Sequence, residues 1–157
     1  MRRTLDAAIP ALRMPHGISL RTWREGDAPA VHALLVHAYA DGGGRVEGYA
    51  AWRRSFTTDA EYAPECCFLA FQGERLAGAA LCWSSAFIKD LCVAAPYRRR
   101  GLGAALLNQA LQHFAAAGAR AVTLKVEADN PSGARRLYER LGFEPEPECW
   151  VTRLDVG

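Results

Sequence analysis

The chain has 157 residues, of which 50% are hydrophobic and 23% charged, and these proportions are typical of one soluble globular domain. Seventeen arginines and two lysines nearly balance seventeen acidic residues, and the net charge of +2 argues against a general nucleic-acid-binding protein. No apolar stretch approaches the roughly 20 residues that a membrane-spanning helix needs. We therefore expect no nucleic-acid partner and no membrane association.

The first 17 residues contain arginines, an aspartate and two prolines, so they lack the uninterrupted apolar stretch of a secretory signal. We expect residues 1–17 to form a loosely or peripherally packed leader and residues 18–157 to form a single domain. The five cysteines are odd in number and include no C-x-x-C pair, which is typical of free thiols in a reducing compartment. We therefore expect a cytoplasmic protein. We expect no metal either, because no histidine and cysteine stand at ligand spacing.

In chain order, the alternation that begins at Ile18 predicts a strand, and Asp27 is expected to cap the helix that follows it. Three glycines in residues 41–45 separate that first helix from a second one. Hydrophobic periodicity then gives the central elements. They are helices over 28–39, 46–56 and 102–118, and strands over 66–71, 76–83, 86–93 and 120–128.

Asn130 and Pro131 have the residue types that open a helix, and Gly142 is expected to end it. Two further strands, separated by the proline-rich residues 144–148, complete the chain. The order is βααβββαβαββ, which predicts an α/β domain built on one central mixed β-sheet.

The stretch "PYRRRGLGAALLNQALQHF" leads three arginines and two glycines directly into a helix. The first N–H groups of a helix have no internal partner and lie at the positive end of the helix dipole. Glycine at 101 and 103 lets an anion approach the backbone, and the forked donors of Arg98, Arg99 and Arg100 suit phosphate oxygens. The pattern therefore predicts a pyrophosphate-binding loop.

Two common nucleotide motifs do not fit this stretch. The sequence G-x-x-x-x-G-K-[ST] is absent, and Leu106 stands where a dinucleotide-binding fingerprint would have a third small residue. A second segment, "KVEADNPSGARRLYERLGF", supplies a strand, an asparagine-capped helix and a tyrosine on that helix.

Together the two segments resemble the GNAT superfamily of N-acetyltransferases. Residues 98–103 match its Q/R-x-x-G-x-G/A motif, and residues 130–143 match N-x-x-x-A-x-x-x-Y-x-x-x-G-F. The resemblance is strong over residues 88–143. It implies a splayed mixed sheet with helices on both faces, acetyl-CoA as the co-substrate and an amine as the acceptor.

The resemblance also implies which residues hold acetyl-CoA. Its pantetheine arm would pair with the backbone at Leu91 and Val93, and the backbone N–H of Val93 or Cys92 would stabilise the oxyanion. Further contacts are expected from the loop, from the asparagine and from an arginine near the adenosine phosphate. These residues are Arg98, Arg99, Arg100, Gly101, Leu102, Gly103, Ala104, Asn130 and either Arg135 or Arg136.

For catalysis, the resemblance makes Tyr138 the acid that protonates the departing thiolate. The base that deprotonates the acceptor is expected to be Asp90 or Glu127, each on a strand near the cofactor, with Tyr97 and His37 as weaker candidates. The acceptor site is expected between the first two helices and the acidic residues 144–148. Acidic residues of 59–65 and the aromatic side chains of Tyr49, Trp52 and Trp83 are candidates for its walls.

Three functions remain open from the sequence. The first is acetylation of the primary amine of a small metabolite, the second acetylation of a protein N-terminus or lysine, and the third acyl-CoA binding without catalysis. A tyrosine at 138 favours catalysis, because cofactor binding alone does not require an acid. The chain is expected to act as a monomer or a homodimer.

Overall fold

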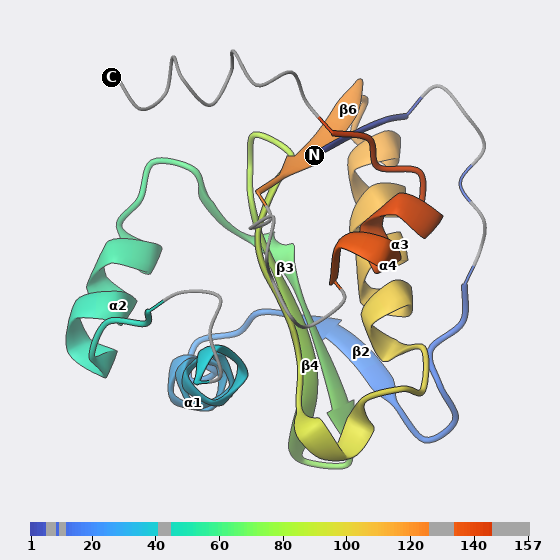
Figure 1. Ribbon diagram of the computed structural model, residues 1–157. Helices are drawn as coiled ribbons and strands as arrows, with labels where there is room; N and C mark the ends of the chain where they lie inside the picture. The colour runs from blue at the N-terminus through green and yellow to red at the C-terminus, as the bar shows by residue number, and fades with distance from the viewer. Residues whose placement is uncertain (6–8, 10–11, 41–44, 126–133, 146–157) are drawn as a thin grey trace.

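The computed structural model describes residues 1–5, 9, 12–40, 45–125 and 134–145 (Figure 1). Its core is one six-stranded sheet in the order β1-β6-β5-β4-β3-β2. The pair β5–β6 is parallel and every other neighbouring pair is antiparallel, so the predicted mixed sheet is confirmed. The strands are β1 (Arg2–Thr4), β2 (Ser19–Thr22), β3 (Tyr62–Gln72), β4 (Arg75–Trp83), β5 (Phe87–Val93) and β6 (Ala121–Leu124).

Helices cover both faces of this sheet, as Figure 1 shows. They are α1 (Ala28–Tyr39), α2 (Tyr49–Thr57), α3 (Leu102–Ala116) and α4 (Ala134–Arg140), with a 3₁₀ turn, η1 (Ala95–Tyr97), ahead of α3. The predicted helices and central strands all appear, with ends shifted by a few residues. Residues 126–133 and 146–157, where the sequence predicts the start of the last helix and the last strand, lie outside the described residues.

The hydrophobic core forms two layers, one on each face of the sheet. On one face, α1 and α2 cover side chains such as Cys67 and Leu69, and on the other α3 and α4 cover Phe68 and Ala70. Neighbouring residues of a strand point to opposite faces, and both faces of β3 and β4 are covered. This explains why these strands are continuous apolar runs with no alternation.

The N-terminal segment begins with a strand that the sequence did not predict. β1 pairs antiparallel with β6, and the backbone of Arg2 also exchanges hydrogen bonds of 2.9 Å with Glu144 on its other side. The Arg3 side chain is buried, and its Nε donates to the carbonyl of Leu141 just after α4. Residues 2–4 are therefore part of the sheet, although the sequence analysis assigned them to a leader.

One capping prediction is wrong. Asp27 precedes α1, but its side chain makes no capping hydrogen bond to the helix. It accepts from the backbone N–H of Arg24 at 2.6 Å and forms a two-pronged ion pair with Arg21 at 2.8 Å. The Arg21 guanidinium offers charge as well as hydrogen bonds, so it outcompetes the helix amide groups for this carboxylate.

Strand β5 contains a bulge that controls where its polar side chains point. Leu81 of β4 faces Asp90, but the next residue, Cys82, faces Ile88, so Lys89 is an extra residue in β5. A bulge changes the facing of the side chains beyond it. Ile88 packs on the α3 side, whereas Lys89 and Asp90 both lie on the side of α1 and α2. Within the described residues, no helix is both long enough and apolar enough to cross a membrane.

Candidate active site

The candidate site centres on β5 from Leu91 to Val93. On the side of β6, this stretch pairs with no residue that the structure describes, and we call it the open edge of β5. The amide of Ala94 donates to the carbonyl of Ala77 on β4, and this register makes Cys92 the next residue whose N–H and C=O face β4. The backbone groups of Leu91 and Val93 must then point away from β4, toward the side of β6. The described pairing of β5 with β6 covers only Phe87 and Ile88.

Leu91 and Val93 thus present backbone donors and acceptors on the side where the sequence analysis expects the pantetheine arm. The same register separates the two candidates for the oxyanion donor. The N–H of Val93 faces the open side, whereas the N–H of Cys92 faces Ala79 of β4.

The loop after β5 has the backbone geometry of an anion-binding cradle. Arg99 and Gly101 both have positive φ angles, of 64° and 82°, which turn successive N–H groups toward one side. Arg98 donates its N–H to Ala95, and Ala105 donates to Gly101. Between them, the amides of residues 99–104 donate no backbone hydrogen bond to any other residue that the structure describes.

The two glycines of this loop have different surroundings. Gly101 has open space around the position of a Cβ, and its left-handed backbone is the reason for glycine there. At Gly103 a Cβ would lie 3.4 Å from Leu137 of α4 and 3.7 Å from Val93. Both are ordinary van der Waals distances, so a Cβ would fit at this position. The contacts show that the start of α3 lies next to Leu137 of α4 and next to Val93 at the end of β5.

The three arginines of the loop are exposed. Arg98 donates from Nε to the carbonyl of Val93 at 3.0 Å, and the Arg100 guanidinium lies 5.8 Å from the ring centre of Tyr97. On α4, Arg135 forms an ion pair with Glu139 at 3.5 Å. Leu102 is buried in the core, so only its backbone can face a ligand.

A partly buried cluster of polar side chains lies on the α1 face of β5. Asp90 is only 9% exposed, and its carboxylate accepts from the Tyr39 hydroxyl at 2.7 Å and from the Lys89 ammonium at 2.8 Å. The ammonium also lies 5.7 Å from the ring centre of Phe56 and 5.9 Å from that of Trp83. The carboxylate is thus held on both oxygens by donors from two elements.

Burial dominates the electrostatics of the neighbouring groups. It raises the pKa of the Cys92 thiol to about 12, and the negative charge of Asp90 acts in the same direction. Burial also raises the pKa of Tyr39 far above its ordinary range, again with help from Asp90. Both groups are therefore protonated at neutral pH, and Tyr39 is a hydrogen-bond donor rather than a base.

Tyr138 lies on the other face of the sheet, within electrostatic reach of this cluster. It is 8% exposed and contacts Phe143 edge-on, with ring centres 5.9 Å apart. Burial raises its pKa to about 12, and Cys92 and Asp90 contribute to the rise. Its hydroxyl makes no hydrogen bond to another residue that the structure describes, and the raised pKa keeps the phenol protonated at neutral pH.

The other predicted site residues either lie outside the described residues or make contacts elsewhere in the fold. Glu127 and Asn130 lie outside the described residues. The Tyr97 hydroxyl is engaged with Gln72 at 2.8 Å, and His37 is exposed on α1. Trp52 is a core residue, because it packs against Trp23, Phe56 and His32.

Tyr39 and Lys89 belong to the cluster but were not predicted as site residues from the sequence. Adjacent residues of a regular strand point to opposite faces, so nothing in the sequence places Lys89 and Asp90 together without the bulge. Tyr39 is the last residue of α1, and only the packing of α1 on β5 brings it to Asp90. A tyrosine next to a glycine-rich loop was the one available signal, and it is a weak one.

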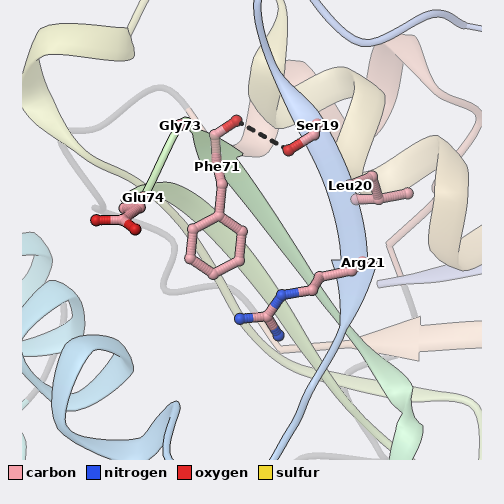
Figure 2. Close-up of a pocket in the computed structure, with 6 residues that line it drawn as sticks. All are labelled: Ser19, Leu20, Arg21, Phe71, Gly73 and Glu74. Carbon is pink, nitrogen blue, oxygen red and sulfur yellow. Dashed lines mark hydrogen bonds between the residues drawn. The ribbon is translucent and has the colours of Figure 1, made fainter.

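A surface hollow of about 410 Å³ lies away from these residues, at the edge formed by β2 and β3 (Figure 2). Ser19, Leu20, Arg21, Phe71, Gly73 and Glu74 line it. The Arg21 guanidinium stacks 4.5 Å from the ring centre of Phe71 and is already paired with Asp27. None of the clustered residues around Asp90 lines this hollow, so it is separate from the candidate site.

Comparisons with known proteins agree with this geometry. Residues 19–143 match the acetyltransferase (GNAT) family, and the chain therefore belongs to that family. It is 32% identical to a mycothiol acetyltransferase of Geodermatophilus obscurus over 91% of this chain and 50% of that protein. It is 37% identical to the N-alpha-acetyltransferase MAK3 of Arabidopsis thaliana over 51% of this chain and 45% of that protein.

Solved structures give the same assignment. A GCN5-related N-acetyltransferase from Sphaerobacter thermophilus has a TM-score of 0.79 at 30% identity, over 92% of this chain and 47% of that one. Naa50 of Arabidopsis thaliana, in complex with the bisubstrate analogue CoA-Ac-MVNAL, has a TM-score of 0.64 at 25% identity. The match covers 83% of this chain and 85% of the Naa50 chain. The chain spans about half the length of the curated relatives that it matches.

Proposed function

We propose that this chain is an acetyl-CoA-dependent N-acetyltransferase that acts on the primary amine of a small metabolite. The observation that carries the proposal is the open backbone edge of β5, with Asp90 on one face and Tyr138 on the other. A pantetheine arm paired with Leu91 and Val93 would bring its thioester between a buried carboxylate and a buried phenol. The pyrophosphate would then reach the unpaired amides of residues 99–104.

In the proposed reaction, Asp90 accepts a proton from the acceptor ammonium, directly or through a water molecule. The free amine attacks the thioester carbon, and the C–N bond forms while the N–H of Val93 stabilises the oxyanion. The adduct collapses with cleavage of the C–S bond, and Tyr138 gives its proton to the CoA thiolate. The second proton on nitrogen leaves to solvent, which restores the phenol. Glu127 remains an alternative base.

The pKa values define how much the acid has to contribute. A thiolate with a pKa near that of cysteine, about 8.5, is already a tolerable leaving group, so the acid contributes an increment rather than the whole rate. Tyr138, with its pKa raised to about 12, is protonated throughout the neutral range. Asp90 keeps two donors on its carboxylate and still has lone pairs free for an acceptor proton.

A small-molecule acceptor is favoured by the extent of the similarities. The mycothiol acetyltransferase aligns over 91% of this chain, whereas MAK3 aligns over 51%. The alignment with the mycothiol acetyltransferase therefore includes the regions from α1 to β3, which would form the acceptor site. Acetylation of protein N-termini is the second candidate, and the similarity to MAK3 and Naa50 supports it.

The proposal is tested by chromatographic measurement of free CoA released from acetyl-CoA across a panel of amines, amino acids and short peptides. Release that depends on a small amine supports the proposal, whereas release only with peptides would favour the second candidate. Binding of acetyl-CoA without release by any acceptor would favour a non-catalytic acyl-CoA-binding module. Failure to bind acetyl-CoA would overturn all three.

A further inference from the structure

Three consecutive arginines, which are indistinguishable in the sequence, have three different environments in the structure. Arg98 donates from its side chain to the carbonyl of Val93 at 3.0 Å. Arg99 has a positive φ of 64° and contributes its backbone to the loop. The guanidinium of Arg100 lies over Tyr97, 5.8 Å from the ring centre, and makes no ion pair with another described residue.

The carbonyl that Arg98 contacts is not an arbitrary one. The register of β4 and β5 directs the C=O of Val93 toward the open side of β5, together with the backbone groups of Leu91. Arg98 therefore binds the same edge at which a pantetheine arm would pair. A carbonyl oxygen has two lone pairs, so Arg98 and a ligand N–H can share it.

The Arg98 contact also links two parts of the site. One end is the edge of β5, and the other is the loop in which the amides of residues 99–104 donate no backbone hydrogen bond to a described residue and would face the pyrophosphate. Acetyl-CoA would have to fit both parts at once, so their separation must be fixed before binding for full affinity. A single hydrogen bond from Arg98 to Val93 ties the loop to the strand.

We propose that Arg98 is a positioning residue for the pantetheine edge of β5 and not a phosphate ligand, and that Arg100 supplies the cationic phosphate contact. This inference rests on the proposed function, because it assumes that acetyl-CoA binds along β5. It assigns different chemistry to the two arginines: Arg98 acts as a hydrogen-bond donor whose charge is dispensable, whereas Arg100 acts through its charge.

Glutamine distinguishes the two roles, because it retains an N–H donor and removes the charge. The experiment measures the affinity of the full chain for acetyl-CoA by calorimetry at low and high salt. The variants are Arg98→Gln, Arg98→Met and, as the matched controls, Arg100→Gln and Arg100→Met. We expect Arg98→Gln to bind within about twofold of the unmodified protein and Arg98→Met to bind roughly tenfold more weakly, the effect of losing one hydrogen bond.

The loss of affinity for acetyl-CoA in Arg98→Met should be the same at both salt concentrations. Both Arg100 variants should weaken binding equally, and their loss should shrink at high salt, because salt screens exposed charges. Equal weakening in Arg98→Gln and Arg98→Met, with a loss that shrinks in salt, would make Arg98 a phosphate ligand and overturn the inference. Unchanged binding in Arg98→Met would also overturn it.

Thermal unfolding of each variant separates these results from a folding defect, and Arg98→Gln keeps the test valid if Arg98→Met does not fold. If the unmodified protein does not bind acetyl-CoA, the proposed function fails. If it binds and the Arg98 variants behave otherwise than expected, only this inference fails.

Discussion

The phenol of Tyr138 lies in a buried position that keeps its hydroxyl protonated. It is buried, and its pKa of about 12 lies above the ordinary tyrosine value of about 10 because burial disfavours the phenolate. The CoA thiolate of the proposed reaction has a conjugate acid with a pKa of about 8.5, so it is a weaker base than the Tyr138 phenolate. The phenol can therefore hydrogen-bond to the leaving sulfur, and it gives up its proton only as the proton lost by the amine nitrogen replaces it. Burial keeps Tyr138 protonated as a donor and at the same time weakens it as an acid.

We expect Tyr138→Phe to lower kcat by about 100-fold, the usual contribution of acid catalysis, and to leave the affinity for acetyl-CoA unchanged. The ring contact with Phe143 survives this change, so thermal unfolding should shift little. Because the pKa of Tyr138 is raised, no loss of kcat from its ionisation should occur between pH 7 and about pH 10 in the unmodified enzyme. A pH–rate profile together with binding measurements checks both statements, and an unaltered kcat would remove Tyr138 from the mechanism.

Tyr39 illustrates how one hydroxyl can support a buried charge. Its hydrogen bond to Asp90 is 2.7 Å long and lies within the protein, where an unsatisfied carboxylate oxygen is costly. Since its pKa is raised far above the neutral range, Tyr39 remains a donor under all ordinary conditions.

We predict that Tyr39→Phe lowers the free energy of unfolding by about 1.5–3 kcal/mol, the cost of removing a hydrogen bond from a buried charged group. Turnover should fall by roughly tenfold, because Asp90 loses one of the two donors that orient it. Urea unfolding and steady-state kinetics measure the two effects. Tyr62→Phe is the matched control, since Tyr62 packs edge-on against Phe56 and its hydroxyl bonds to no described residue. Equal effects of the two substitutions would contradict the role of Tyr39.

At the scale of elements, the loop between η1 and α3 depends on one backbone conformation. Gly101 has a φ of 82°, which side chains of L-residues disfavour by roughly 1–2 kcal/mol, while the position of its missing Cβ is open. The effect of a substitution there is therefore conformational rather than steric.

Gly101→Ala should weaken acetyl-CoA binding by about tenfold, because the cost of holding the left-handed conformation must be met when the amides of the loop bind a phosphate. Calorimetry with acetyl-CoA provides the measurement. Gly73→Ala is a suitable control, since Gly73 also has a positive φ, of 59°, and open space, but lies in the turn between β3 and β4. Gly73→Ala should lower the free energy of unfolding by roughly 1–2 kcal/mol, the cost of the left-handed conformation, and should leave the affinity of the folded protein for acetyl-CoA unchanged.

At the scale of the whole molecule, one ion pair connects the edge strand β2 to the start of α1. The side-chain hydrogen bond from Arg21 lowers the pKa of Asp27 below its ordinary value, and the backbone N–H of Arg24 contributes. A carboxyl whose pKa is lower in the folded state than in the unfolded state stabilises the fold above its unfolded pKa of about 4. That contribution is lost as the pH falls through the folded-state value.

The melting temperature should therefore decrease more steeply below pH 4 in the unmodified protein than in Asp27→Asn, which has no carboxyl to protonate. At pH 7 the variant should be the less stable of the two, and the difference should narrow as the pH falls. Thermal unfolding followed by circular dichroism between pH 3 and pH 7 tests this. Parallel pH curves for the two proteins would show that Asp27 does not carry the acid sensitivity.

The sequence by itself was sufficient for the order of the elements from β2 to α4 and for the presence of a loop ahead of α3. Apolar runs in β3 and β4, helical spacing in α3 and the succession from Arg98 to Gly103 are local patterns, and the backbone responds to them locally. The sequence also pointed to Asp90 and Tyr138 as candidates, although their roles remain predictions. The strand β1 was missed because its three residues acquire their conformation only by pairing with β6.

What the tertiary structure decided is which of these residues meet. The bulge at Lys89 turns Asp90 toward α1, and the packing of α1 brings Tyr39 to it from 51 positions earlier in the chain. The register of β4 on β5 determines that Val93, and not Cys92, presents its backbone to the open side. Such facts depend on contacts between residues far apart in sequence. Local propensity cannot encode them, because a shift of one residue in register reverses which face every side chain of a strand presents.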